Sequence, residues 1–278
     1  MKNISPMIKR YSFIIAIFFS LIVFSGCSST LTTHTVNSMN NFQDGETIGK
    51  DNFNFGFSYG TGQHIKKEVS IEVAEIDDEH VFEYDVKTTK SQTAIINFIT
   101  QRGIRDDLDI LLSGYLSYYS FGGKAALKYN LLSSDLALSL MPGFGYSRGS
   151  SSASRSVFPN IYPGTYENGS FKAKSHLLFA EFNIPMSYEF SENFALHFSL
   201  DLIKYFHVLS TDFSYSSSSD SFGDSEEFSD NFLNPGISAG CRWKHIYPEV
   251  KTVYADDELM IFFGIAFKLE NIPMKKKR

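Results

Sequence analysis

The sequence has little of what defines several common protein classes. Only 2 Cys, 8 Pro and 1 Trp occur among 278 residues, and charged residues make up 20% of the chain. Two cysteines cannot build the disulfide framework of a small secreted domain. The net charge of -6 argues against a nucleic-acid-binding protein, which is normally basic. Only one segment approaches the apolar length of about 20 residues that a membrane-spanning helix needs, which excludes a polytopic helical protein.

Aromatic residues and glycine are abundant instead. The chain has 27 Phe, 15 Tyr and 19 Gly. A disordered chain would leave too much of this aromatic surface in water. The composition therefore indicates a folded, all-β protein.

The first 26 residues have the pattern of a signal peptide. Lys2, Lys9 and Arg10 precede the apolar segment Tyr11–Phe24, which is too short to span a bilayer comfortably. The segment ends in Phe24-Ser25-Gly26-Cys27, which resembles the lipobox of bacterial lipoproteins. An ordinary signal peptide or an uncleaved anchor is the alternative interpretation of the residues.

The lipobox resemblance implies cleavage before Cys27 and a covalent lipid on this residue, with no other cofactor. Ser28 follows in place of the Asp that would imply retention in the inner membrane, so the resemblance implies an outer-membrane lipoprotein. Residues 27–51 are rich in Ser, Thr and Asn, and we expect a flexible, lipid-anchored tether there. A β-barrel is expected over residues 52–270 and a basic tail over 271–278.

From residue 52 onward the hydrophobic period is two. In the run 53–60 every odd position is aromatic and every even one is small or polar. A soluble sandwich or a membrane barrel could produce this pattern. The runs are about 10 to 16 residues long, and a tilted membrane strand needs about 9 to 11. This length, a polar face rich in Gly, Ser and Ala, and aromatic residues near strand ends favour a transmembrane, antiparallel, up-and-down barrel. We expect about 10 strands (8–12), the tenth being residues 246–254, which contain Pro248.

Connection lengths alternate along the chain. Tight polar turns are expected at residues 105–107, 133–135 and 191–193, and long loops at 148–172 and 209–230. Outer-membrane barrels have short periplasmic turns and long outer loops. The lipidated N-terminus should then start at the periplasmic face. Residues 63–91 predict an extension of the first hairpin beyond the membrane, or else a disordered loop.

Three stretches, at residues 100–110, 128–132 and 142–146, resemble hairpins of uncharacterised bacterial outer-membrane β-barrel proteins. The resemblance implies a porin-like barrel in the outer membrane, in contact with its lipid and inserted by the barrel-assembly machinery. The resemblance implies a fold and does not imply an enzymatic activity.

The strongest catalytic candidate is the pair His197 and Ser199, with Asp212 as a third group. Some outer-membrane barrel hydrolases, phospholipases and lipid A deacylases have a His and a Ser two residues apart on one strand, where both share a face. Those enzymes place the pair on the lipid-facing side, whereas here it falls on the polar face. We therefore expect no catalysis, and the sequence has no zinc or phosphate-binding motif.

Charged residues on the predicted polar face should line the lumen: Arg102, Asp109, Lys124, Lys128, Glu181, Asp201 and Arg242. They could line a small pore, or form internal salt bridges that fill a narrow barrel, which is the expectation we favour. We thus predict a structural, surface-interaction or narrow-channel role without nucleic acid, metal or identifiable ligand. The alternatives are a lipid hydrolase using His197 and Ser199, and a soluble, lipocalin-like periplasmic lipid carrier.

Overall fold

A computed structural model describes residues 29–34, 42–43, 45–76, 79–117, 120–154, 168–216, 221–255 and 258–273. These ranges contain eleven strands and no helix long and apolar enough to cross a membrane. The strands are β1 (Ser29–His34), β2 (Asn52–Ile76), β3 (Glu79–Arg105), β4 (Leu108–Ser117), β5 (Ser120–Leu132), β6 (Leu136–Ser154), β7 (Asn168–Ser191), β8 (Phe194–Ser216), β9 (Ser221–Trp243), β10 (Ile246–Ala255) and β11 (Glu258–Pro273).

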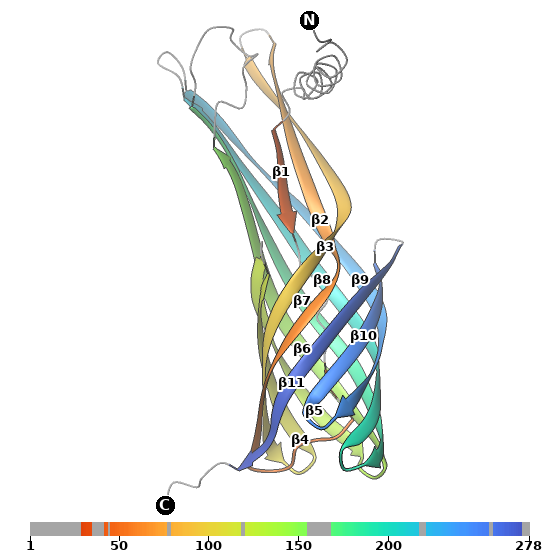
Figure 1. Cartoon of the computed structure of the whole chain (residues 1–278). Helices are drawn as coiled ribbons and strands as arrows, with labels where there is room; N and C mark the ends of the chain where they lie inside the picture. The colour runs from red at the N-terminus through yellow and green to blue at the C-terminus, as the bar shows by residue number, and fades with distance from the viewer. Residues whose placement is uncertain are drawn as a thin grey trace, which may run out of the picture.

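In the part of the chain that the structure describes, strands β2 to β11 form a closed antiparallel barrel of ten strands (Figure 1). Each strand pairs with its neighbours in sequence, and β2 closes the ring: Phe57 lies opposite Phe98 of β3 and Phe267 of β11. The predicted fold and strand count are confirmed. Pro248 lies within β10, where the β9–β10 register has no pair at this residue, so its missing N–H breaks no ladder bond there.

The barrel wall has an apolar outer face and a polar inner face. Phe55, Leu112, Phe198 and Phe263 are 39%, 53%, 37% and 54% exposed, whereas Asn97, Ser139 and Asn183 are buried inside. A soluble lipid carrier would turn its large apolar side chains inward. The arrangement contradicts that alternative, because only hydrocarbon around the barrel makes such an outer face favourable.

The two ends of the barrel differ. At the short-turn end, adjacent strands are joined at residues 106–107, 133–135, 192–193 and 244–245. At the opposite, long-strand end, β2, β3, β7, β8 and β9 continue for total lengths of 25, 27, 24, 23 and 23 residues. Crossing hydrocarbon takes about 9–11 residues, so roughly half of each of these strands projects beyond it.

These projections correct the loops expected from the sequence. Most of the range 209–230 is the paired hairpin of β8 and β9, with Ser210 opposite Glu227. The alternation persists, since Thr211 and Phe213 are buried whereas Asp212 is exposed, but the Ser-rich composition obscured it. The extension predicted for the first hairpin is confirmed by the pairing of Val69 with Val86. The range 148–172 includes residues 155–167, which lie outside the described residues.

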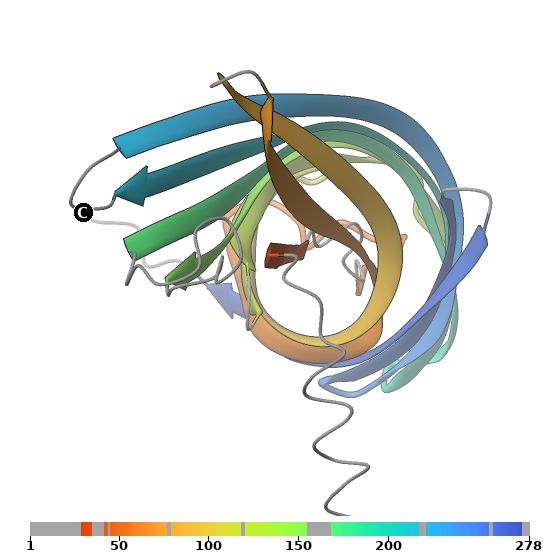
Figure 2. The ribbon, with the colours of Figure 1, turned by 90° about the horizontal axis from the view of Figure 1, so that it is seen from above.

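The chain N-terminal to the barrel enters the lumen. β1 pairs with residues 66–71 of β2, beyond the point where β11 pairs with this strand, and lies inside the ring seen from above (Figure 2). Residues 42–51, apart from the undescribed residue 44, then follow the lumen to the start of β2 at the short-turn end. A flexible tether was expected over residues 27–51. Its last part, residues 42–43 and 45–51, is instead fixed inside the barrel. Cys27 itself lies outside the described residues.

The outward direction of Leu112 predicts a large cost for a charge at this position. Leu112→Arg should destabilise the barrel by about 2–4 kcal/mol, because the guanidinium would face hydrocarbon. The matched control Ser225→Arg, on the projecting part of β9 where the side chain is exposed, should change stability by less than about 0.5 kcal/mol. Urea unfolding in phospholipid vesicles measures both, and equal effects would contradict the assignment of the lipid-facing wall.

Candidate functional site

The lumen contains six of the seven charged residues predicted to line it. Asp109 and Lys128 are fully buried, and Glu181 and Asp201 are nearly so. Lys124 and Arg242 also turn inward, with side chains 10% and 12% exposed. Arg102 is the exception: it is exposed on the outer wall, in phase with the exposed Phe98 on β3. That prediction was wrong because Arg102 was assigned by its charge rather than by its position in the alternation.

Two buried ion pairs lie on the inner face of the wall, and each joins two strands that are separated by one other strand. Lys251 Nζ lies 2.8 Å from Asp201 Oδ2, and both side chains are completely buried. Lys124 Nζ lies 2.9 Å from Glu181 Oε1. Sequence reasoning missed Lys251, although it lies on the same inward face of β10 as the buried Tyr247 and Glu249, at intervals of two residues. The favoured expectation of internal salt bridges, rather than an open polar pore, agrees with these contacts.

The N-terminal lumen segment, defined as described residues 42–43 and 45–51, is held by wall side chains along its length. The Gly45 carbonyl accepts hydrogen bonds from Asn130 Nδ2 (3.1 Å) and Ser139 Oγ, and its N–H donates to Ser187 Oγ (3.0 Å). Lys128 Nζ donates to the Glu46 carbonyl. Buried backbone groups thus find partners in the wall, which an unanchored chain would not have.

Both ends of this segment are fixed as well. The Phe42 N–H donates to Glu249 Oε2 (2.8 Å), Lys268 Nζ donates to the Phe42 carbonyl, and the Phe42 ring is completely buried. Near the short-turn end, the Ile48 N–H donates to Asp109 Oδ2 (3.0 Å). The predicted lumen residues Asp109 and Lys128 therefore hold the chain's own backbone.

Two glycines permit the close approach of segment and wall. A Cβ at Gly45 would overlap the Ala137 carbonyl oxygen, and one at Gly103 would overlap the Gly49 carbonyl oxygen. Gly49 itself has a φ of 77°, which side-chain-bearing residues rarely adopt. The segment fits the lumen because these positions carry no side chain.

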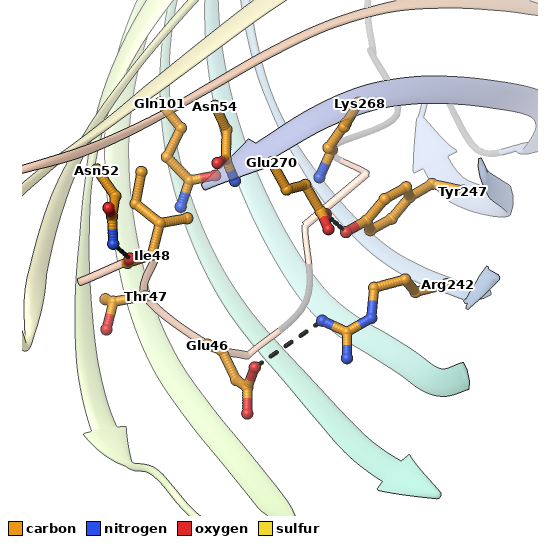
Figure 3. A pocket seen from close by; sticks show the side chains of 10 residues that line it. All are labelled: Glu46, Thr47, Ile48, Asn52, Asn54, Gln101, Arg242, Tyr247, Lys268 and Glu270. Atoms are coloured by element: carbon orange, nitrogen blue, oxygen red, sulfur yellow. Dashed lines mark hydrogen bonds and ion pairs between the residues drawn. The ribbon is translucent and has the colours of Figure 1, made fainter. Parts of the chain in front are cut away.

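A polar cavity of about 310 Å³ lies between the segment and the wall at the short-turn end (Figure 3). Glu46 and Arg242 face one another across it at 3.9 Å, and Tyr247 Oη donates to Glu270 on another side. Arg242 also donates to Glu189 Oε1 (2.9 Å). The cavity thus holds charges of both signs, with Arg242 between two carboxylates, rather than a site of one charge.

An apolar layer fills the lumen farther toward the long-strand end. Tyr115 of β4 and Ile95 of β3 pack in one cluster with Leu177, Phe179, Ile203 and Tyr205 of β7 and β8. The Phe179 and Tyr205 rings have centroids 5.8 Å apart. Because β3 and β4 lie across the ring from β7 and β8, this cluster bridges the barrel interior.

The three catalytic candidates do not form a triad. Ser199 Oγ donates to Asp201 Oδ1 (2.7 Å), while His197 Nε2 lies 3.5 Å from Glu249 Oε2. Asp212 is on the same strand, β8, but on its exposed face and some 50 Å along the strand from His197 at about 3.3 Å per residue. The described ranges contain no group of three His, Cys, Asp or Glu side chains that could hold a metal ion.

No protein-family model and no curated protein sequence matches the chain. Solved outer-membrane barrels do resemble it. The outer membrane protease OmpT of Escherichia coli aligns over 85% of this chain and 100% of its own, with 12% identity and a TM-score of 0.43. Ail, the attachment invasion locus protein of Yersinia pestis, covers 79% and 99% with 14% identity and a TM-score of 0.27. The KdgM porin covers 77% and 98% with 10% identity and a TM-score of 0.26.

The buried pair Lys251–Asp201 predicts strong energetic coupling. Lys251→Met should destabilise the protein by about 3–5 kcal/mol, because Asp201 would keep a buried charge without its cation. The double variant Lys251→Met/Asp201→Leu should recover much of this loss. Urea unfolding of both single variants and the double variant gives the coupling free energy, and strictly additive losses would contradict a direct ion pair.

Proposed function

We propose that this protein is a non-enzymatic outer-membrane barrel lipoprotein whose closed lumen makes it a rigid scaffold for surface interaction rather than a channel. The observation that carries the proposal is the N-terminal lumen segment, whose backbone is hydrogen-bonded to the wall from Phe42 to Asp51. A barrel that conducts would need this segment to leave the lumen.

Closure does not depend on the segment alone. The apolar layer around Tyr115, Phe179 and Tyr205 closes the lumen at a second height. Between these two obstacles, the buried Lys251–Asp201 and Lys124–Glu181 pairs occupy further space. Two independent obstacles in series, the segment and the apolar layer, support a non-conducting barrel more strongly than a gated one.

The projecting strands supply the surface that such a scaffold would present. The β2–β3 hairpin contacts the β8–β9 hairpin through Tyr84 of β3. The Tyr84 hydroxyl donates to Asp224 Oδ2 of β9 (3.1 Å), and its ring centroid lies 6.1 Å from that of Phe228. Burial and this hydrogen bond raise the pKa of the Tyr84 hydroxyl above its usual value, so the hydroxyl stays protonated as a donor in alkaline solution as well as at neutral pH. Contacts between hairpins favour a fixed shape for the projecting sheet.

A non-enzymatic role is supported by the surroundings of His197 and Ser199. Both are buried in the filled lumen, at 3% and 2% exposure, where a lipid substrate has no entry. Ser199 is engaged with Asp201 rather than with His197. The Asp201 carboxylate is also paired with Lys251 Nζ at 2.8 Å, which weakens it as a base for the serine.

The lipid anchor on Cys27 remains part of the proposal, but with a different orientation. β1 begins at Ser29 and pairs with the projecting part of β2, at the long-strand end. Cys27 precedes it by two residues, so chain connectivity keeps it within about 7 Å of Ser29. We therefore propose that the mature chain starts on the long-strand side of the membrane, in place of the periplasmic start expected from the sequence.

Planar-bilayer recording tests the closed lumen. The wild-type protein should give no steady conductance. The triple variant Gly45→Leu/Phe179→Ala/Tyr205→Ala should conduct, because leucine cannot fit beside Ala137 and the apolar layer loses two of its rings.

The single variant Gly114→Leu is the matched control for this recording. A Cβ at Gly114 meets only the Gly122 carbonyl oxygen at 3.8 Å, so the added side chain leaves the lumen unchanged and the barrel silent. Steady current through the wild-type barrel would contradict the scaffold and favour a narrow channel.

The proposed orientation predicts the side of the membrane from which an antibody can reach the start of the mature chain. An epitope inserted after Ser28 should bind antibody on intact cells, because β1 enters the barrel from the long-strand end. Cys27→Ala should abolish labelling by a fatty-acid analogue, yet the protein should still need detergent for extraction, since the barrel alone spans the membrane. Antibody binding only after permeabilisation would place the anchor on the periplasmic side instead.

A further inference from the structure

The lipid-facing wall is hollowed at one place. An open groove of about 610 Å³ runs over β4, β5 and β6 and is bordered by β3 and β7. Its floor consists of the small outward residues Gly114, Gly123 and Ala125, and its borders include Leu112, Phe144 and Leu178. The borders are 53%, 69% and 58% exposed, so they line the groove without filling it.

A cluster of basic side chains lies directly beyond this groove, toward the long-strand end. Tyr146, which lines the groove, is opposite Leu178, and the next outward pair in the register is Arg148 and His176. Lys174 follows two residues farther along β7, and both Arg148 and Lys174 are exposed. Tyr146 Oη lies 2.6 Å from His176 Nδ1, which joins the groove to the basic cluster.

The basic cluster lies at the level of the barrel where the membrane surface is expected. On β7 the outward apolar side chains extend from Phe190 to Leu178, which is long enough for the about 9–11 residues that a tilted membrane strand needs. Arg148, His176 and Lys174 come next, at the level where lipid headgroups begin. No ion pair links Arg148 or Lys174 to a carboxylate of the described chain.

We propose that this wall is a binding site for one multiply acylated, phosphorylated glycolipid of the outer leaflet. Its acyl chains would lie in the groove over Gly114, Gly123 and Ala125, and its phosphate would bind Arg148 and Lys174. The groove faces hydrocarbon, which supplies acyl chains, and the adjoining positive charges complement a phosphate. This site is separate from the lumen and does not depend on the proposed scaffold role.

Titration of the detergent-purified full-length protein with diphosphoryl hexa-acyl lipid A, followed by native mass spectrometry, tests this proposal. One molecule should bind per barrel, more tightly than phosphatidylglycerol. Arg148→Ser/Lys174→Ser should weaken binding about tenfold or more, since each basic residue near an anionic lipid contributes about 1 kcal/mol. Gly114→Leu should weaken it too, because the leucine fills the groove while its Cβ contacts nothing closer than 3.8 Å.

Two matched controls separate a built site from general attraction. Lys87→Ser/Lys244→Ser removes two exposed positive charges away from the groove, and Ala239→Leu enlarges an outward side chain on β9, across the barrel. Both should bind lipid A like the wild type, and unchanged urea midpoints would show that all variants fold. Wild-type protein that does not bind, equal affinity for phosphatidylglycerol, equal loss in the charge control, or wild-type affinity in Gly114→Leu would each overturn the proposal.

Discussion

The closed ladder of backbone hydrogen bonds is the constraint on which the structure depends. In hydrocarbon an unpaired N–H or C=O costs several kcal/mol, so a sheet can cross only when its first and last strands pair. Here the pairing of β2 with both β3 and β11 meets that requirement. Closure divides every strand into an outer and an inner face, and the environment of each face then determines which side chains it carries.

A ring of ten strands leaves a narrow interior, and this chain fills it in two ways. Toward the long-strand end, rings such as Tyr115 and Tyr205 meet across the lumen. Toward the short-turn end, polar and charged side chains surround the N-terminal lumen segment. Buried charges there require partners, and Lys251, Lys128 and Lys268 find them in a carboxylate or in backbone carbonyls. The same groups that exclude water thus fix the segment.

The alternation of side chains made the barrel predictable, because burial on one face only imposes a period of two. It predicts Asp109, Lys124 and Asp201 on the inner face, where these side chains are buried, whereas Arg102, chosen for its charge, points outward. The composition of the projecting β8–β9 hairpin predicts a loop, because its serine and acidic residues hide the alternation that Leu209, Thr211 and Phe213 maintain. The pairing of Ser199 with Asp201 follows from their shared inward face, whereas Asp212 lies on the other face of the same strand.

The lumen segment could not be predicted, because its structure has no local cause. Residues 42–51 lack periodicity, and their partners, from Asn130 and Ser187 to Glu249, are far away in sequence. What keeps the segment in place is covalent: it joins β2 directly, and β2 is the strand that closes the ring. The effective concentration of a group tethered this closely is high, so modest hydrogen bonds suffice to hold it. The pairing of β2 with β3 and β11 therefore closes the barrel and also brings the attached segment into the lumen.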